Sequence, residues 1–146
     1  MPGRAATRDR RLGLTTDVIV INGGSSSGKS TLVAYLQKTL PGLWMALGID
    51  TLVGSLPPRM TGGESSIQFQ DDGQIGIGAD FTRLETAWMH GVAAMGRAGA
   101  KIIVDDGFLS GPPAQRRWRD ALTGLEVVWV GLHCAPAAAA KRETAR

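Results

Sequence analysis

Asp17-Val-Ile-Val-Ile-Asn-Gly23-Gly-Ser-Ser-Ser-Gly28-Lys29-Ser30 is the stretch that decides the fold. Its first half is a run of apolar, mostly β-branched residues, which is typical of a strand buried on both faces of a parallel sheet. Its second half fits the pattern G-x-x-x-x-G-K-[ST] at every position. An amphipathic segment, residues 30–40, follows at once, so strand, glycine-rich turn and helix succeed one another as in a phosphate-binding loop.

The residue types of this loop suit a nucleoside triphosphate. Glycines let the backbone curl so that successive N–H groups point inward, and the N-terminus of the next helix adds the positive end of its dipole. Lys29 can reach the β and γ phosphates, and the Ser30 hydroxyl can bind Mg²⁺. We therefore expect ATP and Mg²⁺ as cofactors, with ATP held by Gly23, Gly24, Ser25, Ser26, Ser27, Gly28, Lys29, Ser30 and Thr31. A dinucleotide is disfavoured because its fingerprint, G-x-G-x-x-G, spaces the glycines differently.

Working outward, strands alternate with helices. Further strands are expected over 43–47, 101–105 and 126–132, and the first of them is expected to be buried. Helices are expected over 50–56, from an N-cap at Asp80 to Gly99, over 112–122 and from Pro136 onward. Segments 66–70 and 74–78 read as a hairpin. This alternation predicts a three-layer α/β fold with a mostly parallel sheet.

Periodicity also predicts which side chains are buried. The apolar face of the first helix includes Tyr35, and that of the long third helix is expected to consist of Leu84, Ala87, Trp88, Gly91, Val92 and Met95. Trp118 and Trp129 are expected in the core as well. Arg116, Arg117 and Arg119 are expected on a solvated helix face, and His90 in solvent.

Carboxylates at strand ends are the remaining candidates for chemistry. The strand Ile102-Ile-Val-Asp105-Asp106 ends in two, as does a strand that holds Mg²⁺ beside ATP phosphates. Adjacent side chains of a strand point to opposite faces, so the two are not expected to act alike, and the sequence does not say which serves the metal. Asp50 has two readings of equal weight: the N-cap of a short helix, or the base that takes a proton from an acceptor hydroxyl.

Composition restricts the remaining classes. The chain has 146 residues and one cysteine, which leaves room for one domain and excludes an internal disulfide framework or a cysteine-cluster metal site. The net charge of +3 is carried by the first eleven residues, which hold four arginines and one aspartate, so a nucleic-acid-binding face is not expected. No apolar run approaches the length of a membrane span. We expect a disordered basic leader over 1–16, a kinase domain over 17–146, and a cytoplasmic location.

The motifs together resemble those of the chloramphenicol phosphotransferase family. The resemblance rests on segments 22–30, 47–50, 75–78, 102–106, 128–131 and 141–146. It implies a P-loop fold like that of nucleoside-monophosphate kinases, and transfer of the ATP γ-phosphate to the primary hydroxyl of chloramphenicol, which inactivates the antibiotic. Lys29 and Asp50 would be catalytic, the latter as base, and Arg146 would match a lid arginine; Ser30 with Asp105 or Asp106 would hold the metal.

Family members continue past Arg146, so the chain is expected to stop within the lid and to lack a last strand and helix. Two alternatives stay open. One is a P-loop kinase for another hydroxyl-bearing metabolite, and the other is an ATP-binding fragment without catalytic activity. The sequence gives no oligomeric state.

Overall fold

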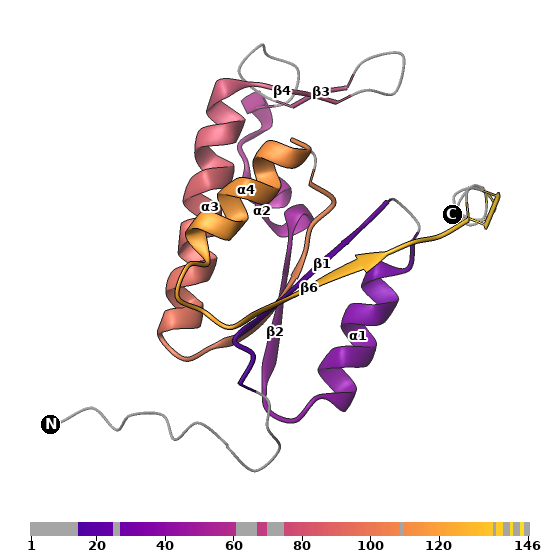
Figure 1. Cartoon of the computed structure of the whole chain (residues 1–146). Helices are drawn as coiled ribbons and strands as arrows, with labels where there is room; N and C mark the ends of the chain where they lie inside the picture. Colours follow the sequence, from indigo (N-terminus) through magenta and orange to yellow (C-terminus); the bar gives the residue numbers. More distant parts are fainter. Residues whose placement is uncertain are drawn as a thin grey trace, which may run out of the picture.

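The computed structural model of the chain describes residues 15–24, 27–60, 67–69, 75–108, 110–135, 137–138, 141 and 144. Its elements follow the predicted alternation of strands and helices (Figure 1). They are β1 (Val18–Gly23), α1 (Lys29–Thr39), β2 (Trp44–Gly48), α2 (Ile49–Ser55), the 3₁₀-helix η2 (Pro58–Met60), β3 (Ile67–Phe69), β4 (Ile75–Ile77), α3 (Ala79–Arg97), β5 (Lys101–Asp105), α4 (Pro112–Ala121) and β6 (Val127–Leu132). Of the expected leader, only Thr15 and Thr16 are described, so the leader stays a prediction.

Within the described residues, four strands form a parallel sheet in the order β2-β5-β1-β6, which confirms the predicted α/β class. The two central strands, β1 and β5, each have a strand on either side, and they are largely buried because helices pack on both of their faces. β3 and β4 pair separately as an antiparallel two-stranded unit, with Ile67 opposite Ile77, so the predicted hairpin segments are confirmed. Its expected turn, residues 71–73, lies outside the described part of the chain.

Helices cover both faces of the sheet and give the three layers predicted (Figure 1). On one face, Val18, Val20, Ile102 and Val104 pack against α3 and α4 in a cluster that includes Met89 and Trp118. On the other face, Ile19, Ile21 and Ile103 pack against Val33 of α1 and against Trp44. Alternate residues of β1 and β5 therefore belong to two separate cores.

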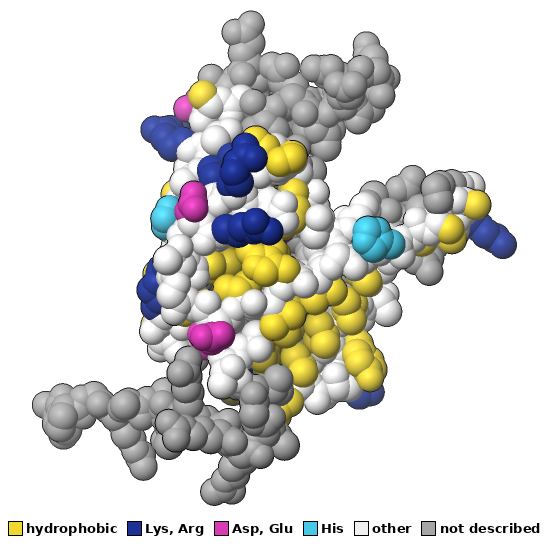
Figure 2. All heavy atoms as spheres, in the orientation of Figure 1, with side chains coloured by type: hydrophobic (Ala, Val, Ile, Leu, Met, Phe, Trp, Pro, Cys, Tyr) yellow, Lys and Arg dark blue, Asp and Glu magenta, His cyan; other side chains and the backbone are white. Residues whose placement is uncertain are grey.

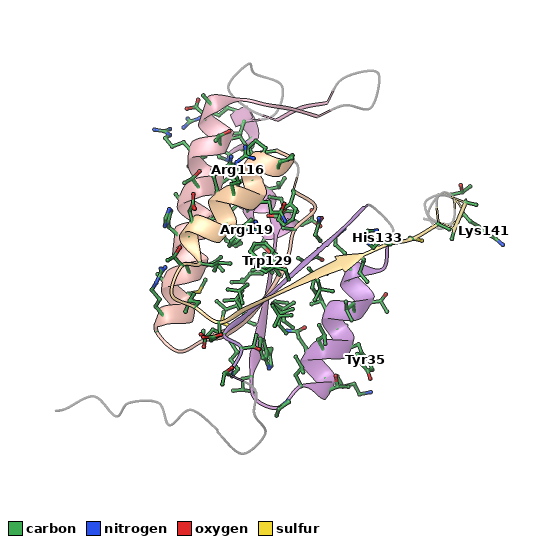
Figure 3. All side chains as sticks on the ribbon, viewed as in Figure 1. Tyr35, Arg116, Arg119, Trp129, His133 and Lys141 are labelled. Atoms are coloured by element: carbon green, nitrogen blue, oxygen red, sulfur yellow. The ribbon has the colours of Figure 1, made fainter. Side chains whose placement is uncertain are left out.

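Both outer strands are less buried than predicted. In β2, Met45 and Ala46 are exposed, and in β6, Val128 and Trp129 are 45% and 36% exposed. Figure 2 shows hydrophobic side chains gathered on the face of the molecule that carries β6. The guanidinium carbon of Arg119 lies 5.6 Å from the centroid of the Trp129 ring (Figure 3). Because Trp129 is exposed and carries this cation contact, the prediction that it lies in the core was wrong.

Two helices present a different face from the one predicted. The buried residues of α3 are Phe81, Glu85, Met89, Val92, Ala93 and Gly96, whereas Ala87 and Gly91 are exposed. The predicted stripe was therefore displaced by about one residue, and the buried face includes a charged residue, Glu85, which an apolar pattern does not count. In α1, Tyr35 is 62% exposed and points away from the core (Figure 3). His90 is exposed and Trp118 is fully buried, as predicted. No helix among the described residues is both long and apolar enough to cross a membrane.

Candidate active site

The glycine-rich loop joins β1 to α1 as the motif predicts. Gly28 precedes α1 with φ of 97°, a left-handed conformation that glycine adopts without steric cost. Gly23 has no room for a side chain, because a Cβ there would lie 2.5 Å from Ser27 Oγ and 3.0 Å from Leu132 Cβ. Within the loop, the Ser27 N–H donates to Gly24 O at 3.2 Å. Ser25 and Ser26 lie outside the described residues.

Polar groups of the loop fit a phosphate. The Lys29 ammonium donates to Gly23 O at 2.7 Å and to Gly24 O at 3.1 Å, which holds its charge over the loop. Ser27 Oγ is buried and has no hydrogen-bond partner, a state that a polar ligand relieves. Ser30 and Thr31 are exposed in the first turn of α1, where backbone N–H groups are free of intrahelical partners. A negatively charged, oxygen-rich ligand satisfies all of these groups.

The register of the sheet brings the predicted carboxylates to the same edge. Asp105 is paired with Ile21 of β1 on one side and with Gly48 of β2 on the other. The loop begins two residues beyond Ile21, and Asp50 follows Gly48 by two residues. The phosphate loop, Asp105 and Asp50 therefore lie at the carboxyl ends of three adjacent parallel strands, which is where ligands bind in open α/β sheets.

The charges of Lys29, Asp50 and Asp106 influence the pKa of Asp105. Burial raises the pKa of Asp105 above its ordinary value of 3.8, and the nearby Lys29 ammonium acts in the opposite direction. The charges of Asp50 and Asp106 raise the same pKa further. An additional cation next to Asp105 would relieve both the desolvation and the repulsion between carboxylates, so the donor set fits a divalent metal.

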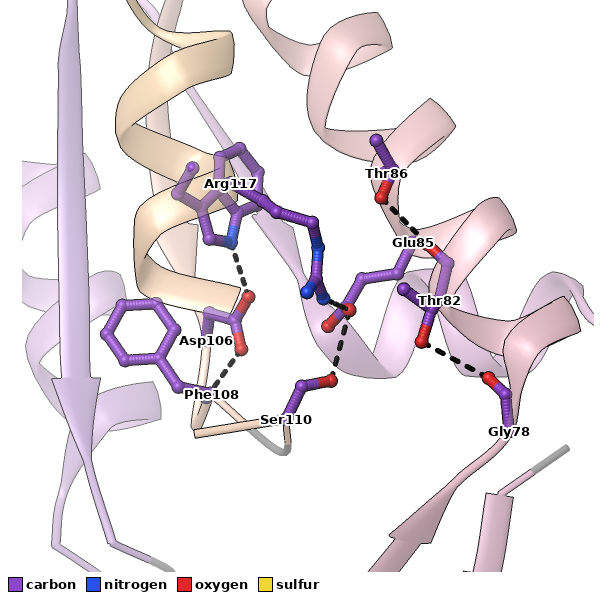
Figure 4. A network of polar contacts seen from close by, with 9 residues as sticks. Gly78, Thr82, Glu85, Thr86, Asp106, Phe108, Ser110 and Arg117 are labelled. Atoms are coloured by element: carbon purple, nitrogen blue, oxygen red, sulfur yellow. Dashed lines mark hydrogen bonds and ion pairs between the residues drawn. The ribbon is translucent and has the colours of Figure 1, made fainter. Parts of the chain in front are cut away.

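Asp105 and Asp106 differ as strand alternation predicts. Asp106 is 2% exposed, and its two oxygens accept hydrogen bonds of 2.7 Å from the Phe108 N–H and from Trp118 Nε1 (Figure 4). Its pKa is raised, mainly by burial. The structure thus ties Asp106 to α4, whereas Asp105 is half-buried beside Lys29. The described residues contain no group of three or more His, Cys, Asp and Glu side chains that could hold a metal, and Mg²⁺ in kinases needs only one or two carboxylates together with substrate phosphates.

Asp50 does not cap its helix. α2 begins at Ile49, its N-cap is Gly48, and no side chain caps it. The reading of Asp50 as a helix N-cap was therefore wrong, and its exposed carboxylate in the first turn is available to a ligand. Asp80, which was also expected to cap a helix, lies at the equivalent second position of α3, after Gly78. Arg146 lies outside the described residues.

A polar cluster of Glu85, Ser110 and Arg117 lies beside the site and was not predicted from the sequence. Glu85 of α3 is fully buried, and its Oε2 accepts hydrogen bonds from the Ser110 hydroxyl at 3.2 Å and from Arg117 of α4 (Figure 4). Burial raises the pKa of Glu85, and the Arg117 guanidinium acts against that rise. The prediction that Arg117 lies on a solvated face was thus wrong. The available signal was the period of α3, in which Phe81, Glu85, Met89 and Val92 share one face.

Comparisons with known proteins agree with this geometry. Residues 16–146 match the family described as chloramphenicol phosphotransferase-like protein. Among solved structures, a sugar kinase from Janibacter sp. HTCC2649 superposes with a TM-score of 0.61 at 16% identity, covering 90% of this chain and 68% of its own. The protein APE1195 gives a TM-score of 0.53 at 16% identity, covering 89% and 67%. These identities establish a shared fold alone. No curated protein matched the sequence significantly.

Proposed function

The chain belongs to the chloramphenicol phosphotransferase-like protein family of P-loop kinases, and from this premise we propose that it transfers the γ-phosphate of ATP to a hydroxyl of chloramphenicol. The observation that carries the proposal is the meeting of the phosphate loop, Asp105 and Asp50 at the carboxyl ends of β1, β5 and β2. This arrangement supports a site in which the donor phosphates lie next to a carboxylate that can serve an acceptor.

Each residue has a role in this reaction. The loop amides and Lys29 bind the β and γ phosphates, and the Lys29 charge offsets the negative charge that develops on the transferring group. The acceptor oxygen attacks the γ phosphorus as the bond from that phosphorus to the β–γ bridging oxygen breaks, which releases ADP. Asp50 takes the hydroxyl proton, so the products are ADP, the phosphate ester and a protonated carboxyl.

Mg²⁺ would be held by the Ser30 hydroxyl and the Asp105 carboxylate, and when bound it neutralises phosphate charge. Asp105 is preferred over Asp106 because both oxygens of Asp106 already accept hydrogen bonds from protein donors. Arg146 would add charge from the lid, as the family resemblance implies. Ser25, Ser26 and Thr31 would contribute loop and helix groups to the nucleotide.

The test is a transfer assay with ATP, Mg²⁺ and a panel of acceptors. Chloramphenicol is compared with an analogue that lacks the primary hydroxyl, with nucleoside monophosphates and with sugars. Mass spectrometry detects the phosphate ester, and a coupled assay measures ADP. We expect an ester with chloramphenicol and none with the analogue, because the analogue keeps the contacts but lacks the nucleophile.

The other outcomes separate the alternatives. Transfer to a different alcohol, with none to chloramphenicol, would mean that the chain is a kinase for another metabolite. Binding of Mg·ATP without transfer to any acceptor would mean an idle ATP-binding domain. Absence of both binding and transfer would contradict the phosphate-loop assignment itself.

A further inference from the structure

The connection between β5 and α4 is strained and held at several points. Its described residues are Asp106, Gly107, Phe108, Ser110 and Gly111. Phe108 has φ of 49°, the left-handed region that bulky side chains rarely adopt, and among the described residues it is the only non-glycine with positive φ. Such a conformation costs of order 1–3 kcal/mol and persists only where the surroundings impose it.

Two buried carboxylates impose it. Asp106 accepts the Phe108 N–H and the indole N–H of Trp118, and Glu85 accepts the Ser110 hydroxyl and the Arg117 guanidinium (Figure 4). Asp106 directly follows β5 and Glu85 lies in α3, but their partners on α4, Trp118 and Arg117, are neighbours in sequence. The described part of the connection is therefore tied to α4 at Asp106 and to α3 at Ser110. The Gly111 N–H, which donates to Phe108 O at 2.6 Å, closes a turn inside it.

Stability alone gives no reason for this arrangement. Glu85 Oε1 and Arg117 Nε are buried without a hydrogen-bond partner, which is costly for charged groups. Replacing a buried ion pair by apolar side chains of similar volume is often neutral or stabilising. A cluster that is only partly satisfied, and that sits beside a strained segment, is instead typical of a site where geometry serves function.

The position of the β5–α4 connection indicates what its shape is for. The connection starts at the residue after Asp105 and lies at the carboxyl edge of the sheet, between the strand end and the helices that cover the face opposite α1. ATP phosphates occupy the α1 side of that edge, because the phosphate loop leads into α1. The side formed by the connection, α3 and α2 is left for the acceptor.

We infer that Glu85 is a positioning residue: acting through Arg117 and Ser110, it holds the β5–α4 connection in the shape that orients the acceptor hydroxyl toward Asp50. This inference rests on the proposed function. It assigns Glu85 no contact with substrate. Its loss therefore impairs use of the acceptor and leaves the binding of Mg·ATP intact.

The test is the double variant Glu85→Leu/Arg117→Leu, which replaces the buried pair by apolar side chains. The matched control is Asp80→Asn/Arg83→Gln, which removes an exposed ion pair from the same helix. Four quantities are measured: the melting temperature, the Kd for Mg·ATP, the kcat and KM for chloramphenicol, and the amide hydrogen exchange of Phe108 and Gly111.

In the double variant we expect kcat/KM for chloramphenicol to fall about 10- to 100-fold, because misplacement by about 1 Å costs this much. The Kd for Mg·ATP changes less than about threefold, the melting temperature is kept, and both amides exchange at least about tenfold faster. The control variant matches the wild type. A kcat/KM within about threefold of wild type, or unchanged amide exchange, overturns the inference.

Ser110→Ala decides the case if the double variant fails to fold. This variant removes one hydroxyl and leaves the ion pair, and we expect a kcat/KM loss of about three- to tenfold at unchanged melting temperature; full activity overturns the inference. If the wild-type chain transfers nothing to chloramphenicol, the proposed acceptor fails. The exchange measurement still tests whether Glu85 holds the connection, because it needs no acceptor.

Discussion

The indole Nε1 of Trp118 donates a 2.7 Å hydrogen bond to Oδ2 of Asp106, and this contact separates the roles of two adjacent carboxylates. With Oδ1 accepting the Phe108 N–H, Asp106 is committed to the interior. Asp105 keeps a half-buried carboxylate beside Lys29. Two substitutions that differ by one position in the chain should therefore fail in different ways.

Asp106→Asn is expected to lose stability, because its amide NH₂ meets a donor where a carboxylate oxygen accepted one. Leaving one buried donor unsatisfied costs about 1–3 kcal/mol. Asp105→Asn is expected to lose no stability, but to lose the Mg²⁺ dependence of ATP binding. Urea unfolding and Mg²⁺ titration of ATP affinity measure the two effects. Equal loss of Mg²⁺ response in both variants would contradict this division.

Lys29→Ala is expected to lower phosphoryl transfer about 10²- to 10³-fold, because a preorganised charge on the β and γ phosphates is removed. Lys38→Ala provides the control, since Lys38 is an exposed lysine in the last turn of the same helix. Initial rates of ADP and ester formation measure both. Activity of Lys29→Ala within about threefold of wild type would refute the phosphate-loop assignment.

Asp50→Asn is expected to lower kcat strongly with little change in melting temperature, because Asn cannot take the hydroxyl proton and Asp50 caps no helix. Asp80→Asn is a close control, because Asp80 is also the second residue of a helix that follows a glycine N-cap. We expect Asp80→Asn to turn over normally. Normal turnover of Asp50→Asn would remove it as the base.

The raised pKa of Asp105 predicts a pH effect with a definite sign. The folded chain binds the proton more tightly than the unfolded chain, so this carboxyl favours folding fully below about pH 3.8, and that contribution is lost as the pH rises through its folded pKa. Asp105→Asn should therefore gain stability relative to wild type between pH 4 and 7. Urea unfolding without Mg²⁺ across this range measures the difference, and parallel curves would argue against it.

The nucleotide side of the molecule could be predicted from the sequence because its signals are local. A run of apolar residues, a glycine spacing and a following amphipathic segment specify β1, the loop and α1 without reference to the rest of the chain. The position of two adjacent carboxylates, one ending β5 and one directly after it, could be predicted for the same reason. Which of the two carboxylates is tied to the interior could not be predicted, because it depends on Trp118, which lies on a helix and is twelve residues from Asp106.

The arrangement of the α3 and α4 side of the molecule depends on contacts between elements that are distant in sequence. Glu85 and Arg117 look solvated by residue type, and only the packing of α3 against α4 shows that they are buried together. In the same way, the apolar residues of β2 and β6 do not say that these strands lie at the edges of the described sheet. Strand order and helix packing are tertiary properties, so composition and period predict them poorly.

The alternation of β5 has a consequence for how this chain tolerates sequence change. Asp105 lies on the face of the sheet with Ile103 and α1, and Asp106 on the face with Val104 and Trp118. Odd or even position along the strand therefore decides which face each carboxylate joins. Inserting or deleting one residue within β5 would move each carboxylate to the opposite face of the sheet, so that both would lose their present partners. If the proposed function holds, substitutions on the α3 and α4 side change the surroundings of the acceptor while the residues of the phosphate loop stay the same.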